Sequence, residues 1–122
     1  MISKSDLRTP LSIPINEAST PAERFQNQVL RPVLKLQNDL YISLFSNYAS
    51  RQAPAFSSLT TEKKHLLIEQ SLQKDTVLKN TLIGISIGML TGEELETYIS
   101  DSKTFNKRIL AMITERIKSQ VK

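Results

Sequence analysis

Glu62, His65 and Glu69 have the spacing of metal ligands on one face of a helix. A Glu-x-x-His pair places a carboxylate and an imidazole side by side, as in the metal sites of carboxylate-rich helical bundles. Those sites need a second Glu-x-x-His pair, and His65 is the single histidine of this chain. The flanking Lys63 and Lys64 are typical of an exposed helix start. We therefore expect no metal and no other cofactor, unless a homodimer completes the set of ligands.

Gln26, Gln37 and Arg116 are polar residues at positions where helix periodicity favours apolar ones. A polar group in such a place needs a hydrogen-bond partner. In one interpretation the glutamines bind loop carbonyls or water, and Arg116 extends its guanidinium to solvent. In the other, the three residues line a small polar pocket that binds a ligand. The sequence leaves both interpretations open.

Gly84 and Gly88 lie four residues apart and leave one helical face without side chains. Another backbone can approach such a face closely. We expect packing against the first helix of the same chain, with a seam between two copies in a homodimer as the alternative.

The composition excludes several classes of catalytic site. Without cysteine the chain has no disulfide, zinc–thiolate site, iron–sulfur cluster or thiol nucleophile. Its three glycines form neither a GxGxxG nor a P-loop pattern. With one histidine there are no clustered imidazole ligands either. These exclusions favour binding over catalysis.

The charge of the chain is mixed, with 16 basic and 12 acidic residues and a net charge of +4. Four lysines share one face of the last predicted helix: Lys103, Lys107, Lys118 and Lys122. Basic residues near a helix C-terminus complement its dipole, and few aromatic residues lie nearby to stack on bases. We do not expect a nucleic-acid partner, and weak nucleic-acid binding through this helix is kept as an alternative.

No segment reaches the roughly 18 uncharged apolar residues that a membrane helix requires. The first twenty residues are rich in Ser, Thr and Pro and show no apolar run of a signal peptide. The sequence predicts a flexible arm over residues 1–20 and a cytoplasmic protein without a membrane partner.

A long helix is predicted to begin at Pro21, because Thr20 is a hydroxyl cap and Glu23 stands where a capping box needs it. Apolar residues then recur at helical spacing as far as Tyr48. Pro32 lacks a backbone donor and crowds the preceding turn, which predicts a kink near Gln28–Arg31.

Four further helices follow from cap residues and periodicity. Their predicted extents are 61–74 after Thr60, 76–90 after Asp75, a short helix after Thr91, and a last helix after Asp101 or Ser102. The alternation of residues 82–90 also fits a strand, but no second strand candidate exists to pair with it. We predict an all-α, single-domain bundle of about five helices over residues 21–122, with 76–90 at its centre.

Residues 25–40, FQNQVLRPVLKLQNDL, resemble the opening helix of a family of short all-helical bacterial proteins. The resemblance continues through 69–80 and 106–108 and covers about the last hundred residues. Some members of that family carry a glyoxalase label, so the resemblance implies a small-molecule lyase. It assigns no role to any residue of this chain. Metal-dependent glyoxalases of the β-rich class place histidine and glutamate ligands on several strands, and this sequence predicts neither.

Together these features predict a protein that acts by binding a protein partner or by self-association. The wide apolar arc of the first helix and the glycine-lined third helix carry this expectation. A glyoxalase-like enzyme is the alternative, for which Gln26, Gln37 and Arg116 would supply the polar site.

Overall fold

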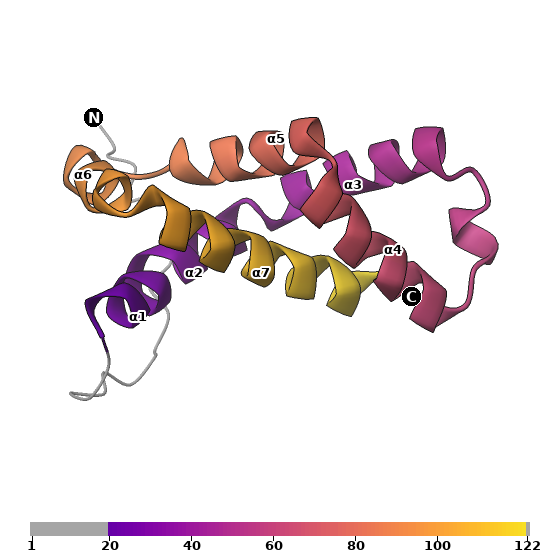
Figure 1. The fold of residues 1–122 in the computed structure, drawn as a ribbon, viewed down its shortest axis with the longest axis horizontal. Coiled ribbons are helices and arrows are strands. Elements are labelled where there is room, and N and C mark those ends of the chain that lie inside the picture. The colour runs from indigo at the N-terminus through magenta and orange to yellow at the C-terminus, as the bar shows by residue number, and fades with distance from the viewer. Residues whose placement is uncertain (1–19, 122) are drawn as a thin grey trace.

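The computed structural model describes residues 20–121, which form a single all-α bundle without a strand in that range (Figure 1). The first of its six helices is continuous from residue 21 to residue 36 and contains α1, a π-helical turn η2, and α2. The elements are α1 (Pro21–Phe25), η2 (Gln26–Leu30), α2 (Arg31–Leu36), α3 (Asn38–Gln52), the short 3₁₀ turn η3 (Phe56–Ser58), α4 (Thr61–Lys74), α5 (Thr76–Ile87), α6 (Gly92–Ser100) and α7 (Ser102–Gln120). This confirms the predicted fold class. The predicted arm lies outside the described residues apart from Thr20.

Hydroxyl and carboxylate caps set where the helices begin, as the sequence predicts. Thr60 accepts a hydrogen bond from the backbone N–H of Lys63 at 3.3 Å, and Asp75 accepts one from Leu78 at 2.9 Å. Thr91 and Glu94 form a complete capping box, in which each side chain binds the other residue's backbone N–H. Each bond satisfies a donor that the first helical turn leaves free.

The predicted irregularity around Pro32 is present as a π-turn. The backbone N–H of Arg31 binds the carbonyl of Gln26, five residues earlier, in place of the usual partner four residues earlier. A proline ring crowds the carbonyl four residues before it, here that of Gln28, and a wider turn relieves that contact.

The prediction of one helix from Pro21 to Tyr48 is wrong at Gln37, where the backbone leaves helical geometry (φ −91°, ψ 6°). α3 begins after this break. Leu36 and Leu40, which the predicted helix included in its apolar arc, remain 41% and 47% exposed.

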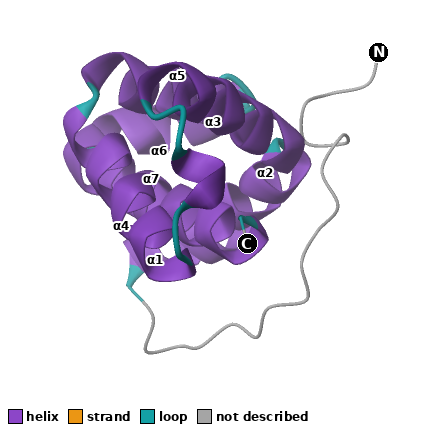
Figure 2. Ribbon diagram, turned by 90° about the vertical axis from the view of Figure 1, so that its right-hand side faces the viewer, coloured by secondary structure: helices purple, strands orange, loops and turns teal. Residues whose placement is uncertain are grey.

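The centre of the bundle is α7, and not residues 76–90 as the sequence suggested. α7 packs against α2, α3, α4, α5 and α6, and Figure 2 shows these helices from one end of the bundle. Its buried stripe repeats every four residues: Phe105, Ile109, Ile113 and Ile117. α5 buries one side only, and Val77 on its outer face is 78% exposed.

No helix within residues 20–121 is both long and apolar enough to cross a membrane.

Candidate anion-binding groove

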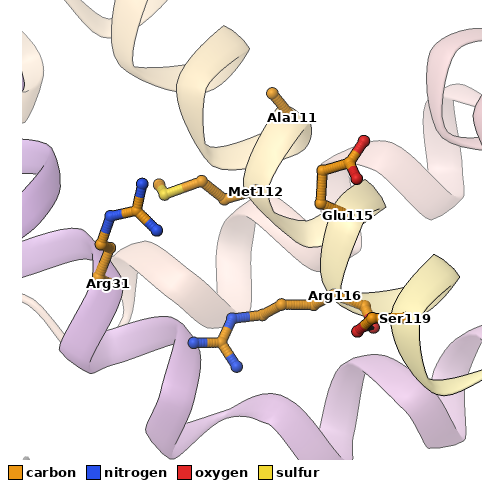
Figure 3. A pocket seen from close by; sticks show the side chains of 6 residues that line it. All are labelled: Arg31, Ala111, Met112, Glu115, Arg116 and Ser119. Atoms are coloured by element: carbon orange, nitrogen blue, oxygen red, sulfur yellow. Dashed lines mark hydrogen bonds between the residues drawn. The ribbon is translucent and has the colours of Figure 1, made fainter.

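A groove of about 410 Å³ lies between α2 and α7. Arg31 at the start of α2 forms one side, and α7 supplies the rest of the lining: Ala111, Met112, Glu115, Arg116 and Ser119. Figure 3 shows the two guanidinium groups and the Met112 thioether extending into the space between the helices. The groove therefore brings two cationic groups together beside an apolar one.

Neither arginine of the groove is paired with a carboxylate among residues 20–121. Arg31 donates from Nε to the side-chain oxygen of Asn27 at 2.8 Å. Arg116 donates from Nη1 to the side-chain oxygen of Asn38 at 3.4 Å. Both partners are neutral amides, so the positive charges are held in place without being neutralised.

The surroundings of Arg116 disfavour its charge. Burial lowers the pKa of Arg116 below its ordinary value, Tyr41 offsets part of this effect, and the like charge of Arg31 lowers the pKa further. A guanidinium stays protonated in spite of such shifts, because its ordinary pKa is far above neutral pH. A bound anion would offset the cost of burying the charge on Arg116 and the repulsion between the two arginines.

The π-turn η2 fixes the direction of Arg31. Before the turn, Phe25 packs on Phe105 of α7, with 4.8 Å between the ring centroids. After it, Pro32 is buried while Arg31 turns toward the groove. The additional residue of a π-turn changes the rotation between these two positions relative to an α-helix.

A second groove, of about 530 Å³, lies on the adjacent face of α7, against α4. It shares Ala111 and Glu115 with the first groove. Its charges neutralise one another: Lys118 forms an ion pair with Glu69 and lies 3.6 Å from Glu115. The four charged residues of this groove, Glu69, Lys107, Glu115 and Lys118, therefore sum to no net charge.

The residues with metal-ligand spacing, for which we expect no metal, do not converge. His65 places Nε2 3.1 Å from the carbonyl of Lys118, which only accepts, so the ring nitrogen donates. Glu69 is engaged by Lys118, and Glu62 is exposed. Across residues 20–121 no three histidine or carboxylate side chains are grouped closely enough to hold a metal ion.

The two glutamines of the predicted polar pocket bind elsewhere. Gln26 accepts a hydrogen bond from Arg108 of α7 at 2.6 Å, and Gln37 donates to the carbonyl of Ile85 in α5 at 3.1 Å. Of the three residues of that pocket, the groove between α2 and α7 is lined by Arg116 alone. Its partner Arg31 was missed, because helical periodicity places it outside the apolar arc and nothing local indicates that α7 lies opposite.

The glycines of α5 do not pack against another helix of the chain. A Cβ atom on Gly84 would meet no atom within 4 Å, and one on Gly88 would meet only carbonyls of its own helix, the nearer at 3.3 Å. The prediction of close packing within the chain is wrong, because α5 turns Leu82 and Ser86 inward and Gly84 outward. A seam between two copies stays a prediction.

The lysines of α7 do not form one free basic face. Lys103 and Lys107 are exposed, whereas Lys118 is engaged by Glu69. Lys122 lies outside the described residues.

Comparison with protein-family models, with curated proteins and with solved structures finds no match for this chain. The geometry of its own residues is therefore the basis for a function.

Proposed function

We propose that this protein acts by binding a partner that presents an anionic group to Arg31 and Arg116. The observation that carries the proposal is that both guanidinium groups face one groove with only amide partners among the described residues. Most of their N–H donors are left for a ligand, and their planar geometry matches a carboxylate or phosphate.

The energetic cost of the arrangement supports a binding role. Two like charges are held beside one groove, and burial further disfavours the charge on Arg116. Neither arginine obtains a salt bridge in return within residues 20–121. Groups that are unfavourable for the folded chain alone are typical of binding sites, where the ligand supplies the missing interaction.

Titration of the ¹⁵N-labelled protein with sodium acetate tests the proposal, with sodium chloride as the control for ionic strength. The side-chain Nε–Hε signals of Arg31 and Arg116 should shift saturably with acetate and much less with chloride. Arg31→Gln and Arg116→Gln should each abolish saturation, because both cations face the same ligand. Arg51→Gln, which removes an exposed arginine of α3, should leave binding unchanged. Equal shifts at Arg51, or no saturation, would contradict the proposal.

Self-association through α5 is a second candidate, in which the outer face of α5 packs on a second copy of the chain. It is favoured by Gly84, which is exposed in mid-helix with open space where a Cβ would lie. An exposed helical glycine costs about 1 kcal/mol relative to alanine, and no contact within the described chain returns that cost. Sedimentation velocity at high micromolar concentration should then show a dimer that Gly84→Glu converts to monomer. A monomeric wild-type protein would exclude it.

A further inference from the structure

The groove between α2 and α7 combines a small net charge with an apolar wall. Arg31 and Arg116 contribute two positive charges and Glu115 one negative charge, which leaves a net charge of one. Glu115 lies 3.6 Å from Lys118, and its side chain is 75% exposed. A lining of this kind is neutralised by one negative charge on a ligand, and the carboxylate of Glu115 weakens its attraction for a second.

Met112 supplies the apolar wall. It lies one turn before Arg116 on α7, and its thioether extends toward the same space as the two guanidinium groups (Figure 3). The methyl group of Ala111 continues this wall. A methionine side chain adapts to apolar groups of different shapes. The part of a ligand that follows its anionic head would therefore lie against Met112.

We infer that the groove binds an aliphatic monocarboxylate, with its carboxylate on Arg31 and Arg116 and its hydrocarbon stem along Met112. This inference rests on the proposed function and narrows it from anions in general to one chemical class. The guanidinium groups recognise the carboxylate, Met112 favours an apolar stem, and Glu115 disfavours dianions such as sulfate.

The test compares acetate, butyrate, hexanoate and sulfate by the saturable shifts of the Arg31 and Arg116 side-chain signals. Each methylene that leaves water completely contributes about a fourfold gain in affinity. Because the groove is open to solvent, about half of that free energy applies, and hexanoate should bind about tenfold more tightly than acetate. Sulfate should bind less tightly than hexanoate.

Two variants separate the contributions of the wall and of the charge. Met112→Gln keeps the length of the side chain and removes its apolar end, so hexanoate should lose most of its advantage over acetate. Glu115→Gln should strengthen sulfate binding by about threefold, the size of a typical surface charge interaction, and change hexanoate less. Thermal unfolding followed by circular dichroism checks that each variant is folded. Nuclear Overhauser contacts between the hexanoate chain and the Met112 methyl group give a readout that does not depend on any substitution.

Equal affinities for acetate, butyrate and hexanoate would overturn the inference, as would sulfate binding that exceeds that of hexanoate in the wild-type protein. Chain-length dependence that survives Met112→Gln, together with no contacts from hexanoate to Met112, would also overturn it. In these cases acetate binding that depends on Arg31 and Arg116 would still support the proposed function. If none of the anions bound, that result would contradict both this inference and the proposed function.

Discussion

Replacing Tyr41 by phenylalanine should change the alkaline stability of the protein more than its stability at neutral pH. Tyr41 is completely buried and its hydroxyl lies 2.7 Å from Oγ of Ser86. Ser86 donates its single hydroxyl hydrogen to the carbonyl of Leu82 at 2.9 Å, so the phenol of Tyr41 is the donor to Ser86. Burial raises the pKa of Tyr41 from 10.0 to about 12, while the charge of Arg116 opposes part of the rise.

The sign of the effect follows from which state holds the proton more tightly. Below pH 10 the phenol is protonated in both the folded and the unfolded chain, and Tyr41 adds no pH dependence. Between pH 10 and 12 the unfolded chain loses this proton while the folded chain retains it, so the free energy of unfolding falls. The decrease is about 1.4 kcal/mol for each pH unit and about 3 kcal/mol over the whole interval.

Urea unfolding at pH 8, 10, 11 and 12, followed by circular dichroism, measures this decrease. Tyr41→Phe should cost about 1 kcal/mol at pH 8, the contribution of one buried hydrogen bond. It should lose less stability than the wild-type protein between pH 10 and 12. Tyr48→Phe, on the same helix but half-buried, controls for the loss of one tyrosine. Parallel curves for wild type and Tyr41→Phe across this interval would refute the reasoning.

Three further substitutions test other features of the structure by urea unfolding. Gly84→Ala should stabilise the protein by about 0.5 to 1 kcal/mol. Gly88→Ala should stabilise it by less, because only the new Cβ at position 88 would meet a carbonyl oxygen, at 3.3 Å. If Gly84→Ala destabilised the protein instead, that result would indicate a contact at this face. A double-mutant cycle with Arg31→Gln and Arg116→Gln should reveal a repulsion of about 0.2 to 1 kcal/mol between the two side chains. This repulsion should disappear in about 1 M salt. An attractive coupling energy would contradict the electrostatics of the groove. Thr91→Ala should cost about 1 kcal/mol and Thr91→Ser much less, and equal losses would show that the cap hydroxyl contributes nothing.

The sequence predicts helix starts well because their signals are local. Thr60 and Asp75 each bind a backbone donor three residues ahead, so the information for these caps lies within one turn. α4 accordingly has the predicted extent of residues 61–74. Pro32 likewise indicates an irregularity near Gln28–Arg31 from sequence alone, although the sequence predicts a kink there and the structure has a π-turn.

Features that depend on contacts between residues far apart in the chain could not be predicted from the sequence. The break at Gln37 accompanies a hydrogen bond from its side chain to the carbonyl of Ile85 on another helix, which no local pattern contains. The apolar residues of α5 surround the helix almost completely, so periodicity alone did not show that Gly84 would face outward. The candidate groove depends on the packing of α2 against α7, which brings Arg31 and Arg116 together from opposite ends of the described chain.

The π-turn at Gln26–Leu30 also links the length of the chain at this place to the residue that follows it. A π-turn is an α-helix with one inserted residue, and deletion of one residue restores the α-helix while the flanking segments keep their faces. Phe25 would then still reach Phe105, and Arg31 would still point into the groove. The deletion would require a second change, because an α-helical turn before Pro32 brings its ring against a carbonyl. The π-turn and Pro32 thus form a coupled pair, in which loss of the extra residue is viable only together with replacement of the proline.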